Sequence, residues 1–313
     1  MDTYNNFSCF IVGEGTLPIR CAEILLEHEH TIYGMISPDR AVHHWAQERE
    51  IPHLDPKDQT LITFLSQHPF DYLFSIVNMS ILPQGMVELP RRGAINFHDA
   101  PLPRYAGLYA TSWAILQGER VHGVTWHAMT ELVDAGDILK QSLFAIDDDE
   151  TAFTLNAKCY DAAISSFAEL IDDIAYDRVS ARKQNLNERT FFSRSKRPSP
   201  GCILSWNRSA REISAFVRAL DFGSYPNPIG LPKLAIGRDF LIVSEVEVLN
   251  AMSAVPPGTV THIDASFVRV ATNDGEIALR KLLTIDGQPL PMADFVAKFG
   301  LYRKIGPDTP VRQ

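Results

Sequence analysis

The chain has 313 residues, a formal net charge of −9 at pH 7 and a pI near 5.6, and this acidic balance argues against a nucleic-acid partner, which would need a basic face. Its 45% hydrophobic content is ordinary for a globular protein, and its length allows two domains. The sequence has no positively charged amino-terminal region, no 18-residue apolar run and no C-x-x-C pair among its four cysteines, so we expect a cytoplasmic protein without a membrane span, a zinc site or a redox motif.

The first half of the sequence alternates short apolar runs with segments of helical apolar spacing. We expect strands at residues 7–12, 31–36, 71–77, 122–129 and 138–146, and helices at residues 17–28, 41–49, 109–117 and 152–175. This alternation indicates an α/β domain with a mainly parallel sheet. The turn Gly13-Glu14-Gly15 is typical of nucleotide-binding folds, but Pro18 stands where the dinucleotide motif has glycine, so NAD is not expected.

Three polar side chains in the middle of the chain form the candidate site. Asn96 and His98 are two residues apart on an expected strand, so they point to the same side, at the end of the strand where open α/β sheets place their ligand sites. His98 suits a general base, Asn96 could stabilise an oxyanion, and Asp134 could fix the tautomer of the imidazole and favour its protonated form. No serine or cysteine nucleophile lies close by, so the pattern indicates direct acyl transfer to an external nucleophile.

The full motif adds Leu-Pro-x-Tyr-x-Gly at residues 102–107, Gly-Val-Thr at 123–125 and Asp-x-Gly-Asp at 134–137. In this order the motif resembles the folate-dependent formyltransferases. The resemblance implies a Rossmann-like catalytic domain in which Asn96, His98 and Asp134 are catalytic and 10-formyltetrahydrofolate, without a metal, gives its formyl group to an amine. The folate-site candidates carried over with this resemblance are Met79, Ile81, Leu82 and Asp137, the last of which is also expected to support the loop of Asp134.

The second half of the chain is expected to form a separate domain. A polar segment with several arginines and prolines, residues 186–204, predicts a linker between domains at 1–185 and 205–313. Ser205 is expected to cap a helix that runs through Ala219. Short strands at residues 240–249, 258–263, 267–271 and 277–283 predict a small β-barrel. This region is similar to the OB-like carboxyl-terminal domain of methionyl-tRNA formyltransferases, so the resemblance covers nearly the whole chain.

The chain departs from that pattern in one place. Methionyl-tRNA formyltransferases carry a basic, glycine-rich insertion after the second strand, whereas residues 36–40 here pass directly into the next helix. The chain then looks most like the formylation domains of nonribosomal peptide synthetases, which implies an aminoacyl carrier protein as acceptor and downstream synthetase domains as partners. Methionyl-tRNA, an amino sugar nucleotide and water (a 10-formyltetrahydrofolate hydrolase) are the alternatives. A folate-binding module without turnover is a further alternative, against which the intact trio argues.

Overall fold

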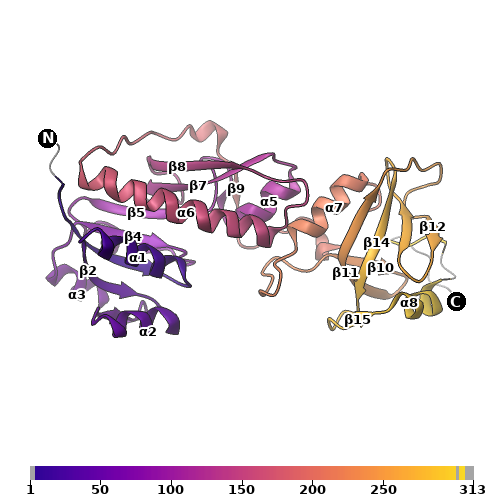
Figure 1. Ribbon diagram of the computed structural model, residues 1–313, viewed down its shortest axis with the longest axis horizontal. Coiled ribbons are helices and arrows are strands. Elements are labelled where there is room, and N and C mark those ends of the chain that lie inside the picture. Colours follow the sequence, from indigo (N-terminus) through magenta and orange to yellow (C-terminus); the bar gives the residue numbers. More distant parts are fainter. Residues whose placement is uncertain (1–3, 301–302, 307–313) are drawn as a thin grey trace. The chain divides into compact units, whose positions relative to one another are not determined.

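The computed structural model describes residues 4–300 and 303–306. These residues divide into two compact units: residues up to 110, 121–145 and 156–194 form the first, and residues 111–120, 146–155 and those from 195 onward form the second (Figure 1). An α/β sheet in the first unit and an antiparallel sheet in the second confirm the expected fold class. The domain boundaries at residues 185 and 205 remain predictions. None of the helices among the described residues is long and apolar enough to cross a bilayer.

The first unit is built on a seven-stranded sheet with the order β3-β2-β1-β4-β5-β7-β8. Neighbouring strands from β3 to β5 pair in parallel, and β7 and β8 are added antiparallel. The bounds are β1 (Ser8–Gly13), β2 (Thr31–Ile36), β3 (His53–Leu54), β4 (Tyr72–Ile76), β5 (Gly93–His98), β7 (Val121–Ala128) and β8 (Ile138–Ala145). Because β1, β4 and β5 are parallel, their carboxyl ends meet at one edge of the sheet, the usual place for a ligand site.

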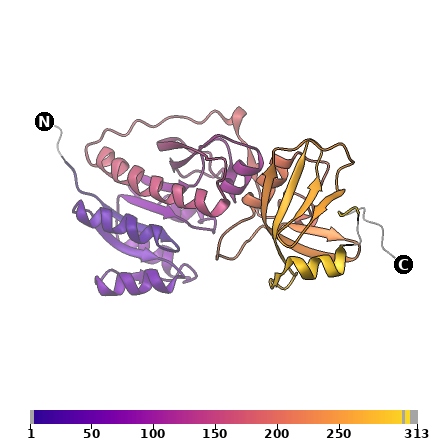
Figure 2. The same ribbon diagram turned by 45° about the vertical axis from the view of Figure 1, so that its right-hand side comes forward.

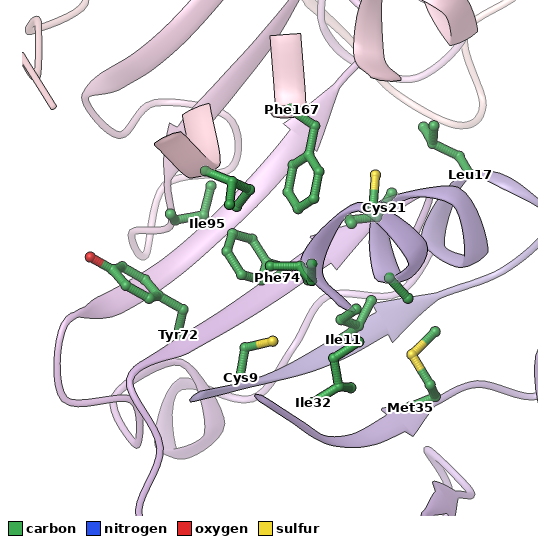
Figure 3. Packing of buried hydrophobic residues seen from close by; sticks show 14 of the residues in the cluster. Cys9, Ile11, Leu17, Cys21, Ile32, Met35, Tyr72, Phe74, Ile95 and Phe167 are labelled. Atoms are coloured by element: carbon green, nitrogen blue, oxygen red, sulfur yellow. The ribbon is translucent and has the colours of Figure 1, made fainter. Parts of the chain in front are cut away.

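Helices cover both faces of this sheet. Their bounds are α1 (Leu17–Glu27), α2 (Arg40–Glu48) and α6 (Ala152–Ala175) for one face, and α3 (Leu61–Gln67) and α4 (Gln84–Val87) for the other. Successive residues of β1 point to opposite faces. Cys9 and Ile11 pack in the core that includes Phe167 of α6 (Figure 3), whereas Phe10 and Val12 pack in the core beneath α3. Burial on both faces explains why β1 is a continuous apolar run in the sequence.

A buried histidine, His30, packs against Phe7, which belongs to the core that includes Phe167. His30 is 3% exposed, and its ring stacks on that of Phe7 with centroids 3.7 Å apart. Its Nδ1 accepts the Phe7 N–H at 3.3 Å, and its Nε2 lies 3.1 Å from the Tyr4 hydroxyl. Burial lowers the pKa of the His30 imidazole to about 4; His28 acts in the same direction, and Asp172 opposes it.

This imidazole predicts a stability that falls with acid. Above about pH 6.5 His30 is neutral in both the folded and the unfolded chain, so its protonation does not change the free energy of unfolding. Between that pH and about 4, the unfolded chain binds a proton that the folded chain resists. The free energy of unfolding should therefore decrease by about 1–3 kcal/mol across this window as the pH is lowered. Urea unfolding of the parent and of His30→Gln, which lacks this titration, measures the difference; parallel pH profiles for the two proteins would contradict it.

The second unit carries an antiparallel sheet with the order β10-β11-β14-β13-β12, and β15 pairs with β14. Its element bounds are η2 (Pro200–Cys202), α7 (Ala210–Ala219), β10 (Lys233–Ile236), β11 (Asp239–Leu249), β12 (Val260–Ile263), β13 (Val268–Ala271), β14 (Glu276–Leu283), β15 (Pro289–Leu290) and α8 (Met292–Phe299). Residues 304–306 connect the two edge strands of this sheet. Gly306 pairs with Ile236 of β10, and Lys304 pairs with Thr259, directly before β12. Figure 2 shows the strands curving into an open, half-barrel arrangement, in agreement with the expected small barrel.

The start of α7 differs from the expectation. The N-cap is Ser209, whose hydroxyl accepts the Glu212 N–H while the Glu212 carboxylate accepts the Ser209 N–H. The prediction that Ser205 caps this helix was wrong, because a serine alone does not identify an N-cap. The reciprocal Ser-x-x-Glu capping box at residues 209–212 does.

Candidate active site

Asn96 and His98 stand at the carboxyl end of β5, on the same side of the strand. β5 pairs antiparallel with β7, which places His127 opposite Asn96 and Thr125 opposite His98. The loop between β7 and β8 carries Asp134, whose carboxylate lies 3.8 Å from the His98 ring. The structure therefore brings the three predicted catalytic residues together from one strand and one loop.

His98 is buried, and each of its ring nitrogens has a defined neighbour. Nε2 lies 2.8 Å from the backbone oxygen of Tyr105. Because a carbonyl oxygen only accepts, Nε2 carries the proton of the neutral imidazole. Nδ1 then holds the lone pair, and it lies 3.8 Å from Oδ2 of Asp134 and 3.8 Å from Oδ1 of Asp99. The Tyr105 carbonyl, rather than Asp134 as expected, thus selects the tautomer, and Nδ1 faces both carboxylates.

Asp134 sits in the β7–β8 loop with a left-handed backbone, φ 55°. Its Oδ2 accepts the Gly107 N–H at 2.8 Å, and its Oδ1 lies 3.5 Å from His127 Nε2. Burial by itself raises the pKa of this carboxyl, but His98, His127 and the Gly107 N–H outweigh burial and hold the pKa well below its usual range. Asp134 is therefore a carboxylate at neutral pH, as a stabiliser of imidazolium must be.

His127 connects Asn96 with Asp134. Its Nδ1 donates to the Ala128 oxygen at 2.9 Å, and its Nε2 lies 3.2 Å from the Asn96 Nδ2 and 3.5 Å from the Asp134 carboxylate. The Asn96 Nδ2 also donates to the Phe97 oxygen at 2.9 Å. Both N–H groups of the carboxamide thus face protein acceptors. Donation to an oxyanion, the role predicted for Asn96, requires that one of these hydrogen bonds be exchanged.

Two glycines of the sequence motif allow the loops to approach this closely. Gly107 has φ 96°, and a Cβ there would lie 2.3 Å from the Phe192 oxygen. A Cβ on Gly136 would lie 1.8 Å from the Ala128 oxygen. A larger residue at either position would move the backbone that carries or contacts Asp134.

The folate-site candidates lie in two loops. Met79 is 47% exposed and Ile81 is 85% exposed, in the loop after β4, while Leu82 packs against the core. β4 is the parallel neighbour of β5, so this loop leaves the sheet at the same edge as His98. Asp137 accepts the Ala128 N–H at 2.9 Å through its backbone oxygen and closes the loop of Asp134. Binding of folate by these four residues stays a prediction.

Sequence reasoning missed two features of this site. One is Asp99, whose position directly after His98 was a signal that could have been used. The other is the segment of residues 184–194, within and beside the expected linker. Here β9 (Phe191–Phe192) pairs in parallel with β6 (Ala106–Gly107), and Gln184 hydrogen-bonds to the loop of Asp134. A polar segment gives no sequence signal for so short a strand.

Comparisons with known proteins show which families and folds this chain is similar to. The chain matches the family descriptions "Formyl transferase" over residues 37–171 and "Formyl transferase, C-terminal domain" over residues 200–300. It is 26% identical over 293 residues to methionyl-tRNA formyltransferase from Legionella pneumophila (strain Paris), covering 89% of this chain and 91% of the relative. The fold is similar to the N-formyltransferase from Helicobacter canadensis in complex with folinic acid and dTDP-3-aminofucose (TM-score 0.71, 20% identity, 87% of this chain and 98% of that one). It is also similar to HypX from Aquifex aeolicus in complex with tetrahydrofolic acid (TM-score 0.64, 16% identity, 98% of this chain and 49% of HypX).

Proposed function

The chain belongs to the formyltransferase family, and we propose that it transfers a formyl group from 10-formyltetrahydrofolate to a primary amine. The observation that carries this proposal is the meeting of Asn96, His98 and Asp134 at the carboxyl edge of the sheet. A base, an amide donor and a carboxylate are the groups that direct acyl transfer needs. The reduced folates in the complexes of the Helicobacter and Aquifex proteins support a folate donor.

The loop after β4 suits a flat aromatic ring. Val77, Met79 and Ile81 are each at least 40% exposed there, although they are large and apolar. Val77 has φ 53°, a strained conformation for a β-branched residue, and such strain clusters at ligand sites. Arg194 holds the loop through a hydrogen bond to the Met79 oxygen at 3.1 Å. We infer that the pterin packs on these side chains and that backbone groups of the loop meet its polar edge.

In the proposed reaction, each of these residues has a separate role. The amine nitrogen attacks the formyl carbon and forms a new C–N bond, while Nδ1 of His98 takes the proton that the amine loses. The carboxamide of Asn96 donates to the oxygen on which negative charge develops. Asp134 and Asp99 stabilise the imidazolium, which returns the proton to N10 of the folate as the old C–N bond breaks. The products are a formamide and tetrahydrofolate, so atoms and charge balance.

We propose an aminoacyl group on a carrier protein as the acceptor. The support is the connection between β2 and α2, which consists of Ser37, Pro38 and Asp39 only. Asp39 caps α2 by accepting the Ala41 N–H at 2.8 Å, and its other carboxylate oxygen accepts the Gly15 N–H at 2.8 Å. A short connection that ends in the doubly hydrogen-bonded carboxylate of Asp39 leaves no basic loop here for an RNA backbone, and the net charge of −9 acts in the same direction.

An amino sugar carried on a nucleotide is the second candidate acceptor. The Helicobacter protein, whose complex contains dTDP-3-aminofucose, is covered over 98% of its length by this chain. Both candidates present a primary amine to the same base, so His98 and Asn96 do not distinguish them. The distinction depends on what the rest of the acceptor contacts.

An acceptor screen tests these assignments. With 10-formyltetrahydrofolate as donor, we expect tetrahydrofolate release with an aminoacyl carrier protein to exceed that with methionyl-tRNA at physiological salt by about tenfold or more. Amino sugar nucleotides and water are offered in parallel, and the His98→Ala variant measures background. Efficient formylation of the sugar nucleotide would favour the second candidate. Efficient formylation of the tRNA would exclude the carrier-protein assignment, and folate release with water alone would indicate a hydrolase.

A further inference from the structure

The segment that follows β8 and α6 in the chain returns to the candidate active site. Arg182 is fixed to β8 by two backbone hydrogen bonds with Ile138, each 2.8 Å long. Farther along, the Thr190 oxygen accepts the Ala106 N–H at 2.9 Å, and its hydroxyl accepts the Tyr105 N–H at 2.7 Å. We call residues 182–192 the strap. It touches the turn whose carbonyl, that of Tyr105, selects the tautomer of His98.

Within the strap, Gln184 contacts the loop that carries Asp134. Its Nε2 donates to the Asp134 oxygen at 3.0 Å and to the Gly136 oxygen at 2.7 Å. Because both partners are carbonyls, the NH₂ end of the carboxamide must face them. One side chain therefore ties two backbone groups on either side of Ala135. These bonds fix the direction of the peptide units around Asp134, which has the uncommon φ of 55°.

The setting of Gln184 differs from that of its neighbours. Lys183 and Asn185 are exposed, whereas Gln184 is partly buried. Its Oε1 is buried without a hydrogen-bond partner among the described residues. A buried acceptor left unpaired costs stability. Arg189 adds a second tie, from its Nη2 to the Val133 oxygen at 3.0 Å.

We propose that Gln184 is a positioning residue, which holds the loop of Asp134 so that its carboxylate stays between His98, His127 and the Gly107 N–H. The proposal rests on the formyl transfer proposed above. Without the two hydrogen bonds, the peptides around Asp134 can rotate, and the 2.8 Å bond from Gly107 to Oδ2 weakens. The charge that stabilises the imidazolium of His98 is then misplaced, although every catalytic residue is present.

The test replaces Gln184 by methionine, which keeps its length and removes its donors. We expect kcat to fall about 10- to 100-fold, because small misplacements of a catalytic group have effects of this size. KM for 10-formyltetrahydrofolate should stay within about threefold, because both hydrogen bonds of Gln184 go to the loop of Asp134, whereas the side chains proposed to pack on the pterin lie in the loop after β4. In an Asp134→Asn background, the same replacement should cause almost no further loss of kcat, because Gln184 acts through Asp134. Asn185→Ala is the matched control, since its contacts stay within the strap, at Asn187 and Glu188.

A second measurement is independent of activity. The Gly107 N–H donates to the Asp134 carboxylate, so its hydrogen exchange by NMR reports the position of that carboxylate. Exchange should accelerate in Gln184→Met and not in Asn185→Ala, and Gln184→Lys, which restores N–H donors, should recover protection. Parental kcat and parental Gly107 exchange would overturn the proposal, as would a loss of protection that extends equally to the β1–β2 pair. If the parent shows no formyl transfer, the proposed function fails, and the Gly107 exchange still decides whether Gln184 positions Asp134.

Discussion

Replacing His98 by alanine is expected to lower the turnover number of formyl transfer about 10²–10⁴-fold, because the variant loses the group that accepts the amine proton. The structure identifies the atom involved. Nε2 is occupied by the Tyr105 oxygen at 2.8 Å, so Nδ1 is the basic nitrogen. A base of this kind must be unprotonated to work.

The control for this variant is His44→Ala, which removes an exposed imidazole of α2 whose partner is Glu48. Both variants are compared with the parent in turnover, folate affinity and melting temperature. If His98 only tied the strand to the Tyr105 turn, His98→Ala would lose melting temperature and folate affinity together with activity. A folded His98→Ala protein that binds folate and turns over within a few-fold of the parent would show that another group is the base.

The proximity of Asn96, His98 and Asp134 could be predicted from the sequence because its geometry is largely set by one strand and its neighbour. Asn96 and His98 are two residues apart on one strand, so the strand alone places them on one side. Asp134 follows the antiparallel neighbour of that strand, and the register sets His127 opposite Asn96. The β7–β8 loop, which carries Asp134, then needs only to fold back over the carboxyl end of β5. The left-handed backbone at Asp134 and the close approach at Gly136 make that return possible.

The strap could not be predicted, for a physical reason. Its strand β9 is two residues long, and it pairs with β6 because Gly107 has no Cβ to meet the Phe192 oxygen. Gln184 finds its acceptors in a loop that is distant in sequence. Neither contact produces a hydrophobic period in the segment. The polar residues of this segment therefore indicated a linker, although the hydrogen bonds of Gln184 and Thr190 connect it to the loop of Asp134 and to the turn of Tyr105.

Asn96→Ala is the second variant with a large expected effect, a loss of about 10²–10³-fold in turnover with little change in donor affinity. The carboxamide is expected to donate to the oxyanion, whose charge exists only in the transition state, so kcat should fall while binding of the ground state is kept. In the structure, its N–H groups face the Phe97 oxygen at 2.9 Å and His127 Nε2 at 3.2 Å. During catalysis, one of these two hydrogen bonds must be replaced by a hydrogen bond to the oxyanion. The His127 contact is the longer and lies on the side of Asp134, so it is the bond we expect to yield.

This exchange distinguishes Asn96 from a residue that only links β5 to β7. A linking role predicts that Asn96→Ala leaves His127 without its neighbour, costs about 1–3 kcal/mol of stability and weakens folate binding in proportion. An oxyanion donor predicts loss of kcat that exceeds any change in melting temperature. Asn6→Ala is the control, because exposed Asn6 makes one hydrogen bond, to the Glu29 oxygen. Turnover, folate affinity and melting temperature are measured for both variants. If Asn96→Ala stays folded and keeps turnover within a few-fold of the parent, the oxyanion must be stabilised by another donor at this edge of the sheet.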